Sequence, residues 1–141
     1  MKLITKNTDY AIRALLEIGC HKNAFISARD IARHQKIPYQ YLRKILQVLI
    51  KNGMIVSKEG SRGGFHLCQD PHKIKLVDVI VMFQGPIEFS ECMFRKQLCP
   101  NRSRCVLRPH LLAIEKEVTK KFATLSIGKL LKKLKLTERK R

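Results

Sequence analysis

Residues 27–53, SARDIARHQKIPYQYLRKILQVLIKNG, contain two short helices joined by a tight turn. Ser27 is a favourable helix N-cap, and Asp30 three residues later forms an approximate capping box. Pro38 suits the first turn of the next helix, which Asn52-Gly53 ends. Apolar residues recur at helical spacing on one side of that helix: Leu42, Ile45, Leu46, Leu49 and Ile50. This pattern predicts a helix-turn-helix.

The other side of the helix after Pro38 is polar. It carries Tyr39, Gln40, Arg43, Lys44 and Gln47, which are side chains that bind phosphates and base edges. A solvated surface helix has a similar charged face, so the pattern alone leaves that alternative open. The neighbouring elements favour the DNA-reading interpretation.

A β-hairpin is expected directly after this helix. Residues 54–58 read as a strand, residues 59–64 as a loop with three glycines, and residues 65–67 as the returning strand. Arg62 at the tip suits a phosphate or the minor groove, although an ordinary turn with a solvated arginine has the same sequence. A helix-turn-helix followed by such a hairpin is a winged helix.

Helices are also expected before and after this unit. The first begins near Thr8 as N-cap, has Asp9 in its first turn, and buries Ile12, Leu15, Leu16 and Ile18. Ala28, Ile31 and Ala32 are the expected buried positions of the helix after Ser27. A short amphipathic segment covers residues 76–83 and is ended by Gly85-Pro86.

A long helix is expected from Val106. Its narrow apolar stripe suits pairing with a partner helix, although packing onto its own domain is the alternative. The stripe consists of Leu107, Leu111, Ile114, Val118 and Phe122. Ser126 is expected to cap a last helix, and residues 137–141 are expected to fray.

The expected fold is therefore mainly α with a small β-hairpin wing: a winged helix-turn-helix plus a long dimerisation helix. Residues 1–86 form the DNA-binding domain and residues 87–105 a cysteine-rich loop. Residues 106–134 form the dimerisation and C-terminal helices, and residues 135–141 a basic tail.

The charge of the chain points to a polyanionic partner. Its 141 residues include 29 Lys and Arg against 11 Asp and Glu, a formal charge of +18, which favours nucleic acid over an anionic membrane surface. We expect no membrane span, no secretory signal and a cytoplasmic location. The sequence has no paired carboxylate site, nucleophile motif or phosphate loop, which argues against an enzyme.

Three of the five cysteines, Cys92, Cys99 and Cys105, are separated by six and five residues in a basic segment. Structural zinc prefers closer pairs, so these gaps favour an iron–sulfur cluster over zinc or plain reduced thiols. The surrounding cations would offset the negative charge of a thiolate-bound cluster: Arg95, Lys96, Arg102, Arg104 and Arg108.

The fourth ligand is open at this point, with His110, Glu88, Glu91 and Asp9 as possible donors. Cys20 and Cys68 read as small core residues. The alternative function is a zinc-stabilised or cluster-free winged-helix DNA-binding protein that senses nothing.

Several short motifs together resemble a known family, to about residue 134. They are Thr8-Asp9-Tyr10-Ala11, Ile31-Ala32, Ile37-Pro38, Tyr41-Leu42, Arg62-Gly63-Gly64-Phe65, Asp78-Val79-Ile80 and the cysteine triplet. In this combination the sequence resembles the BadM-type winged-helix regulators, iron–sulfur transcriptional regulators that include IscR, NsrR and RirA. Lys36 stands in the turn where the family often has glycine.

The resemblance implies a cytoplasmic homodimer that binds a palindromic double-stranded DNA operator, as a repressor, through Tyr39, Gln40, Tyr41, Arg43, Lys44 and Arg62. It implies one cluster per subunit on Cys92, Cys99 and Cys105. Arg108 replaces the histidine ligand of IscR, whereas Asp9 occupies the ligand position of NsrR-like members. A four-iron, four-sulfur cluster is favoured, a two-iron, two-sulfur cluster is the alternative, and nitric oxide, oxygen or iron supply is the implied signal.

Overall fold

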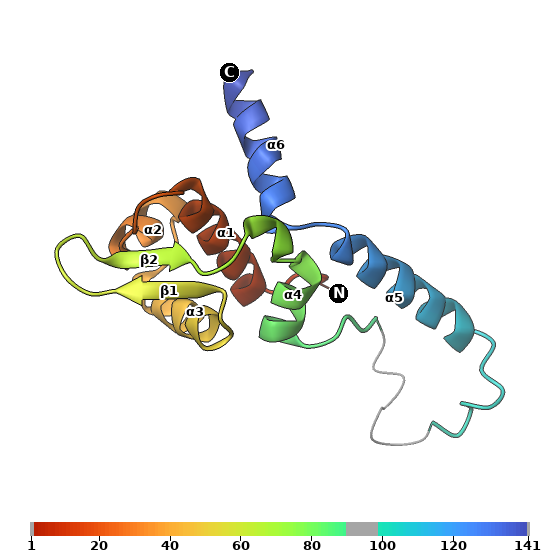
Figure 1. Ribbon diagram of the computed structural model, residues 1–141. Helices are drawn as coiled ribbons and strands as arrows, with labels where there is room; N and C mark the ends of the chain where they lie inside the picture. Colours follow the sequence, from red (N-terminus) through yellow and green to blue (C-terminus); the bar gives the residue numbers. More distant parts are fainter. Residues whose placement is uncertain (1, 90–98, 141) are drawn as a thin grey trace.

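The computed structural model describes residues 2–89 and 99–140. The elements described are α1 (Lys6–Cys20), α2 (Ala28–Gln35), α3 (Tyr39–Lys51), β1 (Ile55–Lys58), β2 (Gly64–Leu67), the 3-10 turn η1 (Pro71–Lys73), α4 (Leu76–Gln84), α5 (Arg108–Ala123) and α6 (Ile127–Arg139). The hairpin, α2 and α3 lie at one end of the molecule, α5 extends toward the other, and α6 projects from the middle (Figure 1). This arrangement confirms a mainly α winged helix with a two-stranded wing.

Helix α1 starts earlier than its sequence predicted. Thr5 is the N-cap, with the Thr8 N–H donating to Thr5 Oγ1 at 3.4 Å, so the prediction of Thr8 as N-cap was wrong. Both threonines are suitable caps. Thr8 is fully buried instead, and its hydroxyl donates to Gln84 Oε1 at 2.8 Å. A tertiary contact therefore decided between two local alternatives.

Gln84, at the end of α4, ties that helix to the N-terminal segment. Its Oε1 also accepts from the Thr5 N–H at 2.9 Å, and its Nε2 donates to the Leu3 carbonyl at 2.9 Å. Gly85 follows at φ +81°, a conformation that glycine adopts without strain, and ends the helix.

The turn between α2 and α3 follows the sequence expectation. Ser27 caps α2, because its Oγ accepts from the Asp30 N–H at 3.1 Å and donates to the Asp30 carboxylate at 2.8 Å. Lys36 has left-handed backbone angles, φ 52° and ψ 46°, and the Ile37 N–H donates to the Ala32 carbonyl at 3.0 Å. The turn therefore has the geometry of a glycine position but holds a side chain.

Helix α3 packs on the core through Leu42, Ile45, Leu46 and Leu49, all buried. Ile50, expected on the same side, is 38% exposed because it lies at the edge of that face. The helix ends at Asn52, whose side-chain amide donates to the Val48 carbonyl at 2.8 Å.

The wing is an antiparallel hairpin that pairs Ile55 with Leu67 and Lys58 with Gly64. Its second strand also bridges to the segment before α2, since the Phe65 N–H donates to the Ile26 carbonyl at 2.8 Å. Gly64, at φ +145°, allows this approach, because a Cβ there would lie 2.3 Å from the Ile26 oxygen. The wing is thereby fixed to the helical core.

The C-terminal helices differ from their predictions at the ends. Helix α5 begins at Arg108, with Pro109 in its first turn, and not at Val106, which is exposed. Ser126 caps α6 as predicted, accepting from the Lys129 N–H at 3.2 Å. Helix α6 continues to Arg139, so residues 137–139 are helical where fraying was expected.

The apolar stripe of α5 divides between two environments. Phe122 packs against the core and Leu111 and Val118 are half-buried, whereas Leu107 and Ile114 are 59% and 51% exposed. The chain therefore covers part of the stripe itself and leaves the rest open. Within the described ranges 2–89 and 99–140, none of the helices has the length and apolar character needed to cross a membrane.

The strained turn at Lys36 gives a stability prediction. Lys36→Gly should raise the free energy of unfolding by up to about 1 kcal/mol, because glycine adopts left-handed angles without a Cβ clash. Urea denaturation followed by circular dichroism measures the change. Lys36→Ala removes the same charge but keeps the Cβ atom, so it should give no comparable gain. A gain of the same size in both variants would show that charge, and not backbone strain, limits this turn.

Candidate functional site

The polar face of α3 is open to solvent. Tyr39, Gln40, Arg43, Lys44 and Gln47 are exposed, and Tyr41 is the most open of the two tyrosines at 52%. The residues of this helix that were predicted to contact DNA are therefore all exposed to solvent: Tyr39, Gln40, Tyr41, Arg43 and Lys44. The same helix buries its apolar side, so its orientation is fixed by the core and not by the polar residues.

Two cations at this surface lie over tyrosine rings. The Arg43 guanidinium lies 5.9 Å from the centre of the Tyr39 ring, one turn earlier on the helix. The Lys6 ammonium lies 5.6 Å from the Tyr10 ring and 6.0 Å from the Tyr41 ring, and so joins α1 to α3. These distances are within cation–π range. They limit the freedom of side chains that a nucleic acid would otherwise have to order on binding.

The turn that aims α3 is held by side chains of α1. Arg13 Nη1 donates to the Gln35 carbonyl at 2.8 Å. Glu17 accepts from His34 Nδ1 at 2.8 Å and from Gln35 Nε2 at 2.7 Å. The sequence did not predict these contacts of Arg13 and Glu17. A charged residue on an amphipathic helix gives no indication of which distant residue it will bind.

Arg62 is exposed in the loop between β1 and β2. Figure 1 shows this loop projecting past α2 and α3, so the wing tip extends from the same end of the molecule as the polar helix. Gly63 is required beneath it, because a Cβ there would lie 2.1 Å from the Lys58 carbonyl oxygen. The loop thus presents Arg62 on a tightly closed turn.

Two of the three predicted cluster cysteines fall in the described residues. Cys99 and Cys105 are half-buried free thiols, and Cys92 lies outside the described residues. The Arg102 N–H donates to the Cys99 carbonyl at 3.0 Å, and the Arg104 N–H donates to the Asn101 carbonyl at 3.0 Å, so the segment between the thiols consists of turns. In residues 2–89 and 99–140, no three His, Cys, Asp or Glu side chains converge as a metal site would require.

Asp9 is on α1, with its side chain 55% exposed and its carboxylate 3.2 Å from Arg13 Nε. Cys99 and Cys105 lie in the segment that leads into α5. This segment is at the N-terminal end of the helix, which points away from the core (Figure 1). Within one chain, the structure therefore does not bring Asp9 together with these two thiols. The prediction of Asp9 as a ligand stays a prediction, and it requires a second subunit.

The remaining cysteines correct one expectation. Cys20 and Cys68 were predicted to be small core residues, and that prediction was wrong. Both are exposed. Desolvation of its sulfur raises the pKa of the Cys20 thiol, and the Glu17 carboxylate acts in the same direction. The thiol is therefore more firmly protonated than a free cysteine, unlike the thiolate that metal ligation needs.

Comparison with known proteins places this geometry in a family. The model of a family described as "Rrf2: Iron-dependent Transcriptional regulator" matches residues 4–133. The chain belongs to the Rrf2 family. The resemblance to winged-helix regulators that the motifs predicted is thereby confirmed.

Some relatives of this Rrf2 family member are named as regulators, among them NsrR and CymR. The protein rrf2 of Nitratidesulfovibrio vulgaris is 32% identical over 133 residues, covering 94% of this chain and 88% of that one. NsrR of Shouchella clausii is 30% identical over 107 residues, covering 75% and 68%. Among solved structures, T. potens IscR matches with a TM-score of 0.76 at 22% identity, covering 95% of this chain and 88% of that one. CymR of B. subtilis matches with a TM-score of 0.77 at 20% identity, covering 94% and 98%.

These findings settle the class of the protein. The relatives are transcriptional regulators and not enzymes, and the solved structures share the winged-helix fold. This Rrf2 family member is a DNA-binding transcriptional regulator of the helix-turn-helix type. Its residue-level contacts to DNA are a prediction from the exposed face of α3 and the wing.

The surface predicts which arginines contact DNA. Arg43→Gln and Arg62→Gln should each weaken binding to duplex DNA roughly 3–10-fold and lower the salt dependence of binding by about one released counterion. Fluorescence anisotropy over a salt series measures both. Lys116→Gln on α5, an equal charge change at an exposed site, should leave both quantities nearly unchanged. Equal losses in all three variants would mean that only the net charge matters.

Proposed function

We propose that this regulator is a homodimeric repressor that holds an iron–sulfur cluster on Cys92, Cys99 and Cys105, with the partner subunit's Asp9 as fourth ligand. Its operator affinity then depends on the state of the cluster. The observation that carries this proposal is the environment of Cys99 and Cys105, which are free thiols on a turn-rich segment outside the hydrophobic core. The family description, an iron-dependent regulator, supports the same reading.

The donor set fits such a group. Thiolates are the common ligands of iron–sulfur clusters, and neither described thiol is consumed by a disulfide. Arg102 and Arg104 lie on the exposed turns between them, and Arg108 begins α5 three residues after Cys105. Positive side chains at these positions offset the charge of thiolate ligands. When bound, the cluster supplies a centre that reacts with oxygen or nitric oxide.

The second subunit is required by the placement of Asp9. Because Asp9 lies on α1 in the middle of the molecule, and the segment that holds Cys99 and Cys105 lies beyond the outer end of α5, ligation by Asp9 together with these two cysteines needs two chains. Asp9 is open to a partner, since its side chain is more than half exposed. Its present ion pair with Arg13 is a surface pair of little energetic weight, and it can be given up at small cost.

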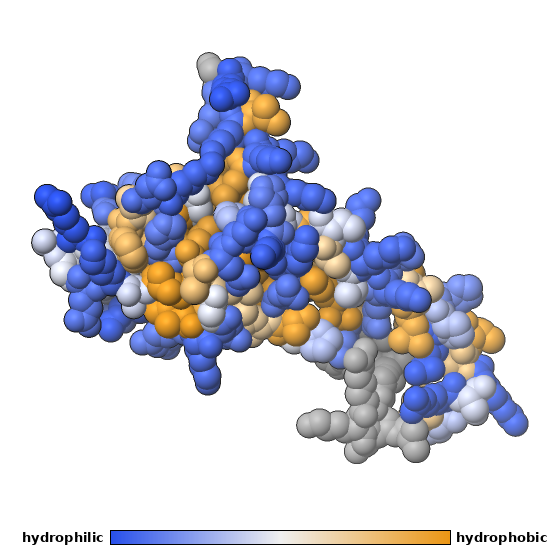
Figure 2. Space-filling model, in the orientation of Figure 1, coloured by the Kyte–Doolittle hydropathy of each residue, from blue (hydrophilic) through white to orange (hydrophobic). Residues whose placement is uncertain are grey.

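The surface that would join the subunits is α5. Leu107 and Ile114 lie two turns apart on one side of this helix, and both are exposed. Figure 2 shows hydrophobic side chains among hydrophilic ones over α5. Exposed apolar side chains that share one side of a helix are a common feature of protein–protein contacts. A paired α5 would cover Leu107 and Ile114, the part of the stripe that the chain leaves open.

Side chains connect the cysteine segment to the DNA-binding unit. The Phe89 N–H donates to Glu115 Oε1 on α5 at 2.8 Å, and Gln84 joins the end of α4 to Thr8 on α1. A shift of the cysteine segment therefore acts on both the pairing helix and α1. Two recognition helices must sit about 34–36 Å apart on an operator, so a small rotation at α5 changes how both engage.

The cysteine assignment predicts an optical signature. Protein purified without oxygen should be brown, with broad absorption near ~400 nm and about four iron and four sulfide per chain. Cys99→Ser and Cys105→Ser should lose most of this absorption, whereas Cys20→Ser and Cys68→Ser, at exposed thiols elsewhere, should keep it. Absorption spectra with iron and sulfide assays make the test. Colourless protein with one zinc per chain, also after reconstitution, would replace the sensor by a zinc-stabilised DNA-binding protein.

Asp9 has its own control in the same experiment. Asp9→Ala should shorten the lifetime of the absorption in air several-fold, because one ligand is lost. Asp78→Ala removes another exposed carboxylate from the first turn of a helix, so it should reproduce only the helix-dipole effect. Identical lifetimes for the two variants would remove Asp9 from the ligand set and leave the three cysteines.

The α5 contact predicts the effect of a buried charge. Ile114→Glu should weaken self-association at least ~100-fold, because two copies of the charge would be buried at the interface. Sedimentation velocity over a concentration series measures this shift from dimer to monomer. Lys116→Glu, on another face of the same helix, should leave the dimer intact. A dimer that persists in Ile114→Glu would exclude this face as the interface.

A further inference from the structure

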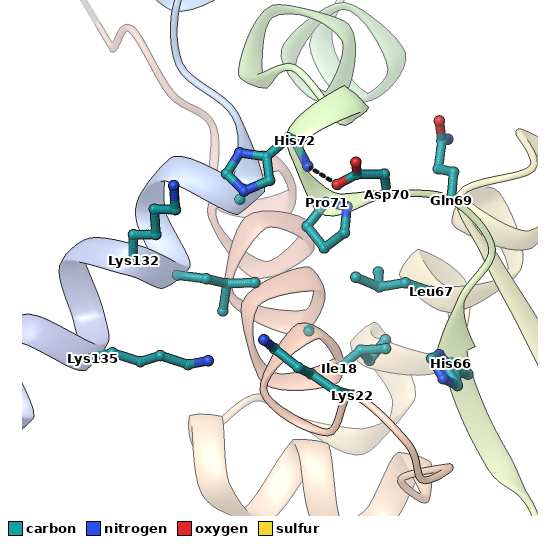
Figure 3. Close-up of a pocket in the computed structure, with 13 residues that line it drawn as sticks. Ile18, Lys22, His66, Leu67, Gln69, Asp70, Pro71, His72, Lys132 and Lys135 are labelled. Atoms are coloured by element: carbon teal, nitrogen blue, oxygen red, sulfur yellow. Dashed lines mark hydrogen bonds between the residues drawn. The ribbon is translucent and has the colours of Figure 1, made fainter.

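A cavity of about 390 Å³ lies between the end of α1, the start of α6 and the segment from β2 to η1 (Figure 3). It is separate from the polar face of α3 and from the cysteine segment. Its volume is within the range of roughly 300–1,000 Å³ that is typical of small-molecule sites.

The inner wall of the cavity is apolar and closely packed. Ile18, Leu67 and Leu131 line it. Gly19 and Gly128 bring α6 close to its neighbours: a Cβ at Gly19 would lie 2.7 Å from Leu131, and a Cβ at Gly128 would lie 2.5 Å from the His72 ring. The glycines therefore fix both the crossing of the helices and the position of the His72 ring beside the cavity.

The opening of the cavity is positively charged. Lys22, Lys132 and Lys135 line it, against the single carboxylate of Asp70 among the lining residues. Asp70 is already engaged, because its Oδ1 accepts from the His72 N–H at 2.9 Å. Three ammonium groups thus line the cavity against one carboxylate, which already accepts a backbone hydrogen bond.

Two of these ammonium groups lie beside each other. Figure 3 shows the side chains of Lys22, from the turn after α1, and Lys135, from α6, extending toward one another. Lys22 lowers the pKa of Lys135, first through a hydrogen bond between the two side chains and then through the repulsion of two like charges. An anion between them would relieve this repulsion and interact with both.

We propose that this cavity binds a small organic carboxylate with an apolar body. The carboxylate would lie among Lys22, Lys132 and Lys135, and the apolar body would lie on Leu67 and Leu131. An inorganic anion would satisfy the lysines but leave the apolar wall unfilled, whereas a neutral apolar molecule would leave the lysines unpaired. The combination of a charged opening and an apolar interior selects a molecule with both parts. The site neither uses nor requires the cluster or the operator.

Isothermal titration of the full-length protein with phenylbutyrate, and with its neutral analogue phenylbutanol, tests the proposal. Phenylbutyrate should bind once per chain, and phenylbutanol and inorganic phosphate should each bind at least ~10-fold more weakly, a difference of about 1.4 kcal/mol. Amide shifts in NMR spectra should be concentrated at residues 66–72 and 128–135. Equal binding of acid and alcohol, or no binding of either, would overturn the proposal.

A matched pair of variants separates the site from the net charge. Lys132→Gln combined with Lys135→Gln should weaken phenylbutyrate binding at least ~10-fold. Lys133→Gln combined with Lys140→Gln removes the same charge from α6 and its C-cap, outside the cavity, and should change phenylbutyrate binding less than ~2-fold. Equal weakening by both pairs would reduce the binding to diffuse attraction and would overturn the site.

The same pairs distinguish a small carboxylate from a DNA phosphate. Both double variants should lose equal, small amounts of affinity for duplex DNA, because the cavity lysines are not assigned to the DNA surface. A loss of DNA affinity confined to Lys132→Gln with Lys135→Gln, without phenylbutyrate binding by the unmodified chain, would assign these lysines to the nucleic-acid backbone instead. That result would leave the proposed cluster unaffected, since the spectrum reports on it independently.

Discussion

The burial of α1 on nearly all sides is the constraint on which the rest of the structure depends. This helix contacts α2, α3, α4, α6 and β2, and Ala11, Ala14, Leu15 and Ile18 are fully buried. Small residues at Ala11, Ala14 and Gly19 let the neighbouring backbones approach closely, so that a short chain builds one continuous core. Without this central helix, the recognition helix, the wing and the C-terminal helices would have no common surface against which to pack.

Several polar side chains of α1 form hydrogen bonds to other elements. Arg13 and Glu17 hold the turn before α3, and Thr8 is bound to Gln84 at the end of α4. The recognition helix and the segment that leads to the cysteines are therefore positioned against the same helix. Coupling between distant sites needs an element that both of them bias, and α1 has the contacts for that role.

The sequence predicted most of the local structure but not the tertiary choices. Ser27, Pro38 and Asn52-Gly53 placed the ends of α2 and α3 correctly, because caps and turns depend on neighbouring residues alone. The sequence predicted Thr8 as the N-cap of α1, but Thr8 is buried against Gln84, far along the chain, and Thr5 is the cap. Cys20 and Cys68 were judged by residue type, although exposure depends on what packs above them. Likewise, the sequence could not predict which residues of the α5 stripe the chain itself covers and which it leaves exposed. Periodicity identifies an apolar face of a helix but not what packs against it.

The positive charge of the chain also shows what composition predicts and what only the structure gives. Composition gives the net charge, and the structure gives the positions of the basic residues. Composition alone indicated one polyanionic partner, yet the basic residues lie on several surfaces. Arg43, Lys44 and Arg62 belong to the α3 and wing end, whereas Arg102, Arg104 and Arg108 lie at the opposite end of the molecule (Figure 1). A third group surrounds the cavity beside α6. Salt screens exposed charges beyond about 8 Å at physiological ionic strength, so cations at one end contribute little to the field at the other. The net charge of the chain therefore does not by itself assign all of these basic residues to DNA.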